Sequence, residues 1–322
     1  MMKKINDIIG DAKTIGIAGH LRPDGDCMGS CMSLYNYLKK NRPDLDVRVF
    51  LEFVDKKFNI IENTDQIITT GYDGTKFDLF ISLDTASLDR LGLNLPFYEN
   101  AKRTACIDHH ASNDGYADYN YILPKASSAS EVLYDLLDED LIDKSIAEPM
   151  YTGIAHDSGV FRFQSTTPKT MRIAANMIEK GVNVNMILEE TFFRKTYNQM
   201  MVTAKIQSEA VLALDGKCIY GYCTSEMMEE YGVTTKDLDA VVASIRNVDG
   251  VEVAMFLYQL SEDSYKVSLR SKNYVDVSKI AKRFGGGGHI RAAGFDMAAN
   301  DPRDIINNIG ALVELQFNSA QR

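Results

Sequence analysis

Residues Thr14–Asp26 read TIGIAGHLRPDGD, and this stretch decides the fold that the sequence predicts. Its first part, Thr14–His20, is a largely apolar run with β-branched residues, which indicates a buried strand. From about Cys27 to Lys40 the apolar residues instead recur with helical spacing. A buried strand that turns directly into a helix is typical of an open parallel sheet, in which ligands bind at that turn.

The same alternation continues along the first half of the chain. Further runs of strand type lie at Leu45–Phe53, Phe77–Asp84 and Arg103–Asp108. Helical periodicity follows at about Ser128–Leu141, Ile146–His156 and Pro168–Lys180. Strands that alternate with helices predict an α/β fold, with a parallel sheet covered by helices on both faces.

A chain of 322 residues is long for a single core, so we expect two domains. Residues Asn185–Ala213 have helical periodicity without proline or glycine, which predicts a connecting helix. Beyond them, short strands and a hairpin are interleaved with predicted helices at about Thr235–Arg246, Val277–Arg283 and Asp301–Gln316. The expected organisation is a parallel-sheet N-terminal domain with flanking helices at 1–185, a helical linker at 186–210, and a smaller mixed-sheet α/β domain at 211–322.

The composition is that of a soluble globular protein, with 45% hydrophobic and 25% charged residues. No apolar run approaches the roughly 18–20 residues that a membrane span requires. Asp7 interrupts the N-terminal apolar stretch before the core of a signal peptide forms. We therefore expect a cytoplasmic protein without a membrane partner.

The net charge of −10 argues against a protein that coats long nucleic acid. The segment Ser264–Arg291 departs from this balance, because it has seven basic residues and only one acid, Asp276. An acidic protein with one local basic segment suits a small anionic ligand better than a long polymer.

The chain has five cysteines, which is not the even number typical of a disulfide framework; they are Cys27, Cys31, Cys106, Cys218 and Cys223. Cys27 and Cys31 are four residues apart on a predicted helix, so they face the same way. Small residues at a helix–sheet contact are the favoured interpretation, and a disulfide or a zinc pair is the alternative.

All five histidines lie in polar clusters rather than in the middle of an apolar run; they are His20, His109, His110, His156 and His289. A single histidine in such a place is usually a surface or core residue, but five of them in four clusters favour a shared site. In the first cluster, Gly19–Asp26, the side chains of Asp24 and Asp26 can both point into one crevice from a tight loop. A dinucleotide site is disfavoured there because the G-x-G-x-x-G spacing is absent. A solvated turn is the remaining alternative.

The other clusters lie at the ends of predicted elements. Asp84 ends one strand, Asp108, His109 and His110 end another, and Asp157 closes a helix. Because parallel strands end at the same edge of a sheet, we expect these side chains to meet near the first cluster.

Aspartates and histidines in this number suit Mn²⁺, Fe²⁺ or Zn²⁺ better than Ca²⁺, and they match Mg²⁺ only in part. They exceed the needs of one ion, so we expect two ions about 3.5–4 Å apart that share a bridging carboxylate. Such a pair lowers the pKa of a bridging water and neutralises the oxygens of a phosphoester under attack. Mn²⁺ is the expected ion, with Mg²⁺, Fe²⁺ or Co²⁺ as alternatives.

At these residues the sequence resembles the DHH phosphoesterase family, which is named for the Asp-His-His found here at Asp108–His110. The resemblance covers nearly the whole chain and implies ligands for both ions: His20 and Asp24 for one, Asp26, His109 and Asp157 for the other, and Asp84 as the bridge. It also implies that Asp84, Asp108 and His110 take part in catalysis, the last two from outside the ligand set. His110 would stabilise the phosphoryl oxygens or assist the leaving group.

Residues Phe284–His289, FGGGGH, resemble the Gly-Gly-Gly-His motif of the family branch that acts on short oligonucleotides and nucleotides. Consecutive glycines let backbone N–H groups approach a phosphate, although a glycine run alone is more often a flexible loop. Arg270 would pair with a terminal phosphate, or else be a solvated strand residue. Ser128 begins a capping box with Glu131, with or without a phosphate contact. The expected substrate-binding residues are Ser128, Arg270, Gly286, Gly287, Gly288, His289 and Arg291.

The resemblance implies an oligoribonuclease for very short RNAs, with 3′-phosphoadenosine 5′-phosphate as a further substrate. At 322 residues the chain has no room for the extra domains with which RecJ-like exonucleases guide long DNA. A hydrolase of linear dinucleotides such as phosphoadenylyl-adenosine would share every motif and is the enzymatic alternative. A non-catalytic nucleotide sensor is the other alternative, and a homodimer stays open. The partners expected are short oligonucleotides or nucleotides with a terminal phosphate, clamped between domains that close through the linker.

Overall fold

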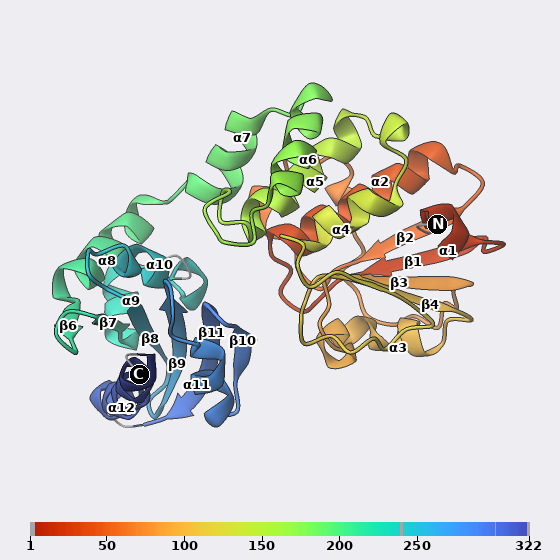
Figure 1. The fold of residues 1–322 in the computed structure, drawn as a ribbon. Coiled ribbons are helices and arrows are strands. Elements are labelled where there is room, and N and C mark those ends of the chain that lie inside the picture. Colours follow the sequence, from red (N-terminus) through yellow and green to blue (C-terminus); the bar gives the residue numbers. More distant parts are fainter. Residues whose placement is uncertain (1–3, 239–240, 300, 321–322) are drawn as a thin grey trace. The chain divides into compact units, whose positions relative to one another are not determined.

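A computed structural model describes residues 4–238, 241–299 and 301–320. The chain folds into two compact units, Met1–Arg194 and Lys195–Arg322. Each unit has a sheet of its own (Figure 1). In the described residues no helix is both long and apolar enough to cross a membrane.

Parallel strands form the sheet of the first unit, in the order β2-β1-β3-β4-β5. They are β1 (Thr14–Ala18), β2 (Asp46–Phe50), β3 (Leu79–Leu83), β4 (Thr104–Asp108) and β5 (Tyr119–Ile122). Every residue of β3 and β4 is buried, which explains why these strands are apolar without alternation. The strand order reverses between β1 and β3, and such a switch point is where open α/β sheets bind ligands.

Helices cover both faces of this sheet (Figure 1). On one face lie α2 (Gly25–Asn41), α4 (Ala129–Leu136), α5 (Lys144–Asp157) and α6 (Pro168–Glu179), with the main hydrophobic core beneath them. On the other face, α3 (Leu95–Glu99) and η3 (Leu88–Asn94) cover a smaller, largely aromatic cluster around Phe80 and Phe97. The remaining helices are α1 (Ile5–Ile9), η1 (Lys56–Phe58), η2 (Thr64–Gln66), η4 (Glu139–Leu141), α7 (Val184–Leu188) and the π-helix η5 (Glu189–Phe193).

The segment expected to form one connecting helix over Asn185–Ala213 is broken, so that prediction was wrong. The π-helix η5 ends at Phe193, and α8 (Tyr197–Glu209) begins as a new helix. The break has a local cause, because Thr196 and Gln199 form a capping box: each side chain accepts the backbone N–H of the other. The last residues of the segment belong to a strand, β6 (Val211–Ala213).

The second unit has a mixed sheet in the order β10-β11-β9-β8-β7-β6. Its other strands are β7 (Cys218–Cys223), β8 (Val253–Ser261), β9 (Ser264–Ser271), β10 (Gly287–His289) and β11 (Ala292–Ala298). β7 and β8 pair in parallel, and the other neighbours pair antiparallel. The predicted α/β class, with one parallel sheet and one mixed sheet, is therefore confirmed.

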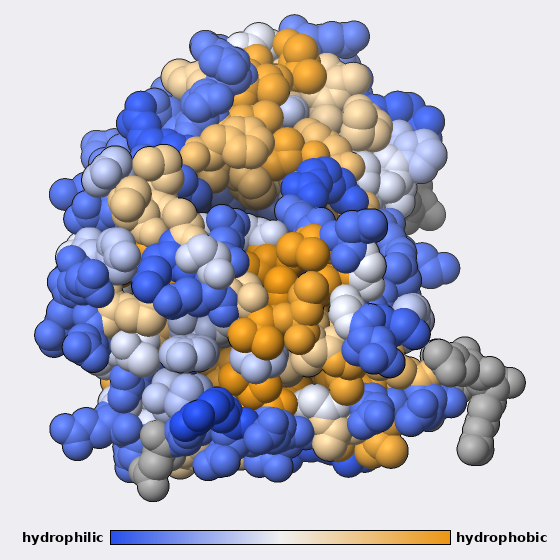
Figure 2. All heavy atoms as spheres, turned by 90° about the vertical axis from the view of Figure 1, so that its left-hand side faces the viewer, coloured by the Kyte–Doolittle hydropathy of each residue, from blue (hydrophilic) through white to orange (hydrophobic). Residues whose placement is uncertain are grey.

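Helices also cover both faces of the second sheet. α11 (Val277–Arg283) and α12 (Pro302–Ala320) pack on one core, and α8, α9 (Ser225–Tyr231) and α10 (Val241–Arg246) pack on the other. The helix expected over Thr235–Arg246 is divided into η6 (Thr235–Asp237) and α10, and its residues 239–240 lie outside the described part of the chain. The edge strand β6 leaves Val211 and Leu212 exposed. Figure 2 shows that hydrophobic residues also gather near the centre of one largely hydrophilic face.

Candidate active site

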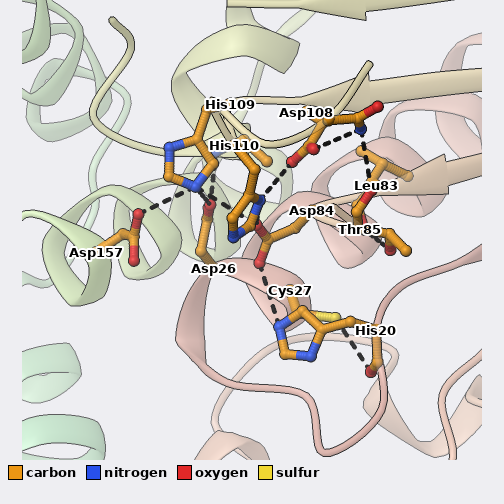
Figure 3. A network of polar contacts seen from close by, with 12 residues as sticks. His20, Asp26, Cys27, Leu83, Asp84, Thr85, Asp108, His109, His110 and Asp157 are labelled. Carbon is orange, nitrogen blue, oxygen red and sulfur yellow. Dashed lines mark hydrogen bonds and ion pairs between the residues drawn. The ribbon is translucent and has the colours of Figure 1, made fainter. Parts of the chain in front are cut away.

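The polar clusters of the first unit meet at the carboxyl edge of its parallel sheet (Figure 3). The loop after β1 brings His20 and Asp24, β3 is followed by Asp84, and β4 is followed by His109. Asp157 is the last residue of α5. Strands and helices far apart in the sequence thus deliver carboxylates and imidazoles to one place.

His20 faces two carboxylates from one side of its ring. Its Nε2 lies 3.4 Å from Asp84 Oδ2 and 3.7 Å from Asp24 Oδ1. Its Nδ1 lies 2.6 Å from the carbonyl oxygen of Leu21, which favours a proton on Nδ1 and leaves the lone pair on Nε2. Asp24 is also the N-cap of α2, where its Oδ1 accepts the backbone N–H groups of Asp26 and Cys27.

His109 repeats this arrangement on the other side of Asp84. Its Nε2 lies 3.2 Å from Asp157 Oδ2, 3.5 Å from Asp84 Oδ1 and 4.0 Å from Asp26 Oδ2. Its Nδ1 lies 3.4 Å from the carbonyl oxygen of Ala126. Asp84 therefore turns one carboxylate oxygen toward each histidine. Its backbone is left-handed, with φ 51°, and strain of this kind is often found at functional sites.

The start of α4 holds the carboxylate of Asp26. Oδ2 accepts the backbone N–H of Ala129 at 2.5 Å, and Oδ1 accepts both the backbone N–H of Ser130 at 3.0 Å and its hydroxyl at 2.6 Å. Ser128 was the residue expected to bind substrate at this helix start, but it is fully buried and its hydroxyl oxygen accepts the N–H of Glu131. Ser130 was missed because its contact with Asp26 spans 104 residues.

Burial and charge shift the ionisation of these groups. Burial raises the pKa of Asp26 to about 7, with a further contribution from Asp84, and it raises the pKa of Asp157 well above its usual range. Burial also opposes ionisation of Asp84, but hydrogen bonds from His109 and His20 outweigh it and keep the pKa of this carboxyl low. Although burial lowers the pKa of His109, Asp84 and Asp157 raise it to about 10. Four carboxylates, those of Asp24, Asp26, Asp84 and Asp157, thus surround the imidazoles of His20 and His109.

Three groups of side chains among the described residues bring ligand atoms within 4.8 Å of one another, as a metal site requires. These groups are Asp26, His109 and Asp157; Asp84, His109 and His110; and His20, Cys27 and Asp84. All contain residues from the predicted clusters, and Cys27 is an addition that the sequence pattern did not assign to the site.

Asp108 lies behind the site and orients His110. Its Oδ1 is 2.8 Å from His110 Nδ1, and its Oδ2 accepts a hydrogen bond of 2.7 Å from the side-chain amide of Asn113. Although burial opposes ionisation, these two contacts lower the pKa of Asp108. Asn113 is buried and was not singled out from the sequence, because an asparagine in a loop after two histidines carries no signal of this contact.

In the second unit, Arg270 and His289 lie on the same face of the sheet. Arg270 in β9 pairs with Ala292 in β11, and Ala292 pairs with His289 in β10. Directly paired residues point to the same face, so the two basic side chains flank the small Ala292. Arg291 instead binds the chain itself, because its guanidinium donates to the carbonyl oxygens of Val275, at 2.7 Å, and Asn273.

The glycines before His289 have two different surroundings: one is required for close packing, and another leaves its backbone open. A Cβ at Gly286, just before β10, would lie 2.2 Å from the carbonyl oxygen of Gly294, so only glycine allows the chain to approach β11 at this position. A Cβ at Gly287 would meet no atom within 4 Å, which leaves the backbone of Gly287 open to a ligand.

Models of known protein families match both units of the chain. A model of the N-terminal domain of the DHH family matches residues 14–154, and a DHHA1 domain model matches residues 215–315. The bifunctional oligoribonuclease and PAP phosphatase NrnA of Thermus thermophilus is 32% identical, over 89% of this chain and 85% of its own length. The Bacillus subtilis protein of the same name is 27% identical, over 91% of this chain and 92% of its own length.

A solved structure, that of an exopolyphosphatase-related protein from Bacteroides fragilis, has a TM-score of 0.86. It covers 96% of this chain and 94% of its own, at 22% identity, which shows a shared fold. The sequence matches extend over both units, and the range matched by the DHH model includes Asp108–His110. The chain therefore belongs to the DHH family of phosphoesterases and is a hydrolytic enzyme.

Proposed function

We propose that the edge of the first sheet binds two divalent cations and hydrolyses phosphoesters of short nucleotides. The observation that supports this most is Asp84, which turns Oδ2 toward His20 and Oδ1 toward His109, as a bridging ligand must. One ion would be held by His20, Asp24 and Asp84, and the other by Asp26, Asp84, His109 and Asp157.

The donor set fits cations of this kind. Carboxylate oxygens and imidazole nitrogens suit Mn²⁺ and similar ions. The raised pKa values of Asp26 and Asp157 mean that, without a cation, protons must offset part of the buried negative charge. When bound, such cations would lower the pKa of the attacking water and neutralise the phosphoryl oxygens of the ester. We propose Mn²⁺ as the physiological ion.

We propose that His110 donates a proton to the leaving oxygen or a hydrogen bond to the phosphoryl group. Asp108 supports this role, because its Oδ1 lies 2.8 Å from Nδ1 and fixes the orientation of the imidazole ring. The proton that His110 donates would be carried by Nε2, the other ring nitrogen. Asn113 keeps the carboxylate of Asp108 in place through its amide.

We propose that Arg270 and His289 bind a terminal phosphate of the substrate, with the open backbone of Gly287 beside them. Arg270 suits this role because a guanidinium can donate two parallel hydrogen bonds to phosphate. Arg291 and Ser128 are better explained by their contacts with the chain itself. The relatives named oligoribonuclease and PAP phosphatase support short oligoribonucleotides and 3′-phosphoadenosine 5′-phosphate as substrates, with mononucleotides and AMP as the respective products.

Incubation of the full chain and Mn²⁺ with a 5′-labelled RNA trimer, and separately with 3′-phosphoadenosine 5′-phosphate, tests this proposal. We expect turnover of the trimer to mononucleotides and release of phosphate from the second substrate. Neither should be turned over after the metal is removed with a chelator, and both activities should return with Mn²⁺. Turnover of neither substrate by the Mn²⁺ form would refute the substrate assignment. Much faster turnover of phosphoadenylyl-adenosine would favour the alternative hydrolase.

A further inference from the structure

Cys27 is the one cysteine of the described residues that belongs to a group of candidate metal ligands. Its sulfur and the ligand atoms of His20 and Asp84 all lie within 4.8 Å of one another, and all three residues are buried. Figure 3 shows the sulfur beside the ring of His20, on the same side as Asp84. The function proposed above does not use this thiol.

The start of α2 places this sulfur beneath the loop of His20. Asp24 caps the helix and accepts the N–H of Cys27, so the thiol sits in the first turn of α2 and faces back toward β1. Gly19 makes room for it, because a Cβ there would lie 2.2 Å from Cys27 Sγ. A loop with any other residue at position 19 would push the thiol away from His20.

Packing alone explains a small side chain at this position, but it does not explain a sulfur within 4.8 Å of the ligand atoms of His20 and Asp84. The hydrogen bond that the thiol gives to the carbonyl oxygen of His20 is 3.9 Å long, which is weak. No disulfide uses the sulfur, since all five cysteines are free. Cys31, one turn further along the same face, is equally buried yet belongs to none of the ligand groups of the described residues.

We infer that Cys27 is a ligand of the ion bound at His20 and Asp84, and that it strengthens the binding of thiophilic cations such as Co²⁺ and Zn²⁺ at this position. On binding, the S–H bond breaks, its proton passes to solvent, and the sulfur donates a lone pair to the cation. Thiolate ligands favour Zn²⁺ and related ions. The ligands proposed for the other ion are carboxylates and the imidazole of His109, which have no such preference. This inference rests on the cation site proposed above.

Titration of the metal-free full chain with Co²⁺, followed by absorption spectroscopy, tests the inference without any measurement of activity. Co²⁺ bound to a protein gives visible d–d absorption, and a sulfur ligand adds an intense charge-transfer band in the near ultraviolet. We expect both signals from the wild-type chain, displacement of the charge-transfer band by Zn²⁺, and its loss in Cys27→Ala. Cys31→Ala is the matched control, since it removes the neighbouring buried thiol and should keep the band. Cys27→Ser, which preserves the volume of the side chain, should behave like Cys27→Ala, with Co²⁺ affinity reduced by about 10-fold or more.

The outcomes separate this inference from the function on which it rests. Visible absorption without a charge-transfer band in the wild-type chain would overturn the role of Cys27 while the cation site stands. A band that persists in Cys27→Ser would overturn it equally. Absence of any Co²⁺ absorption would overturn the cation site and the role of Cys27 together.

Discussion

The edge of the first sheet and the face of the second sheet that carries Arg270 differ in how their polar residues are held. At the first, Asp26 and Asp84 are 1% and 3% exposed, and each carboxylate contacts partners from other elements. On the second, the strand Gly287–His289 is exposed along its whole length. The first region is therefore held in place by its own contacts before any substrate arrives, whereas the second is accessible for recognition. Substitutions in the first should therefore lower kcat, and those in the second should raise KM.

Asp84→Asn should have the largest effect, because it removes the carboxylate that faces both histidines. We expect kcat on the RNA trimer to fall by roughly 10³-fold, since electrostatic stabilisation of this kind is commonly the largest contribution to catalysis. Steady-state kinetics measures the change. Asp114→Asn, which alters an exposed aspartate in the loop after His110, is the control and should keep its activity. A kcat close to that of the wild type in Asp84→Asn would contradict the role of this residue.

His110→Gln should come next, with kcat lower by about 10²-fold, because proton transfer by a positioned side chain typically contributes 10²–10⁴-fold. KM should change little. Mn²⁺ affinity, measured by calorimetry, should also stay near the wild-type value, since His110 is not among the proposed ligands. A large loss of Mn²⁺ binding would instead place His110 on the metal.

Arg270→Ala should raise KM for substrates with a terminal phosphate by roughly 10- to 100-fold, because a charge-assisted hydrogen bond contributes about 1.5–3 kcal/mol. Hydrolysis of an unspecific phosphodiester should be unchanged. Lys266→Ala is the matched control: Lys266 lies on the same strand but pairs with Asp296 at 2.7 Å. Equal losses on both kinds of substrate would refute a role for Arg270 in recognition.

Ser130→Ala should weaken Mn²⁺ binding by about 10-fold, because it removes the hydroxyl that holds Asp26. Calorimetric titration of the metal-free chain measures this loss. Ser127→Ala also removes a buried hydroxyl next to α4, but that hydroxyl donates to Glu131. Weaker binding in both variants to the same degree would mean that the start of the helix matters only for stability.

Arg291→Ala should have the smallest effect on catalysis. It removes hydrogen bonds to Val275 and Asn273, so the free energy of unfolding should fall by about 1–2 kcal/mol while KM stays unchanged. Thermal unfolding and kinetics on the same preparation measure both quantities. A raised KM with unchanged stability would restore the substrate contact that the sequence suggested for Arg291.

The parts of the molecule that the sequence predicts well depend on local pattern and topology. Buried apolar strands end in Asp84 and in Asp108–His110, and a parallel sheet brings such ends to one edge. The parts that were missed depend on contacts between distant residues. The hydroxyl of Ser130 and the amide of Asn113 matter only because folding sets them against carboxylates.

Two other errors have local physical causes. Apolar periodicity continues past Phe193, so the new helix start at Thr196 was hidden within a pattern that looked continuous. Strand β10 was missed because glycine is rare in strands. Its residues form a strand because they pair with β11, and the sequence of β10 alone does not predict this pairing.

Titration of the metal-free full chain with Mn²⁺, followed by electron paramagnetic resonance, tests the central proposal most directly. If Asp84 bridges two ions, two Mn²⁺ should bind per chain and give an exchange-coupled spectrum, which Asp84→Asn should abolish. Binding of a single ion, or two ions with independent spectra in the wild-type chain, would contradict a two-cation site.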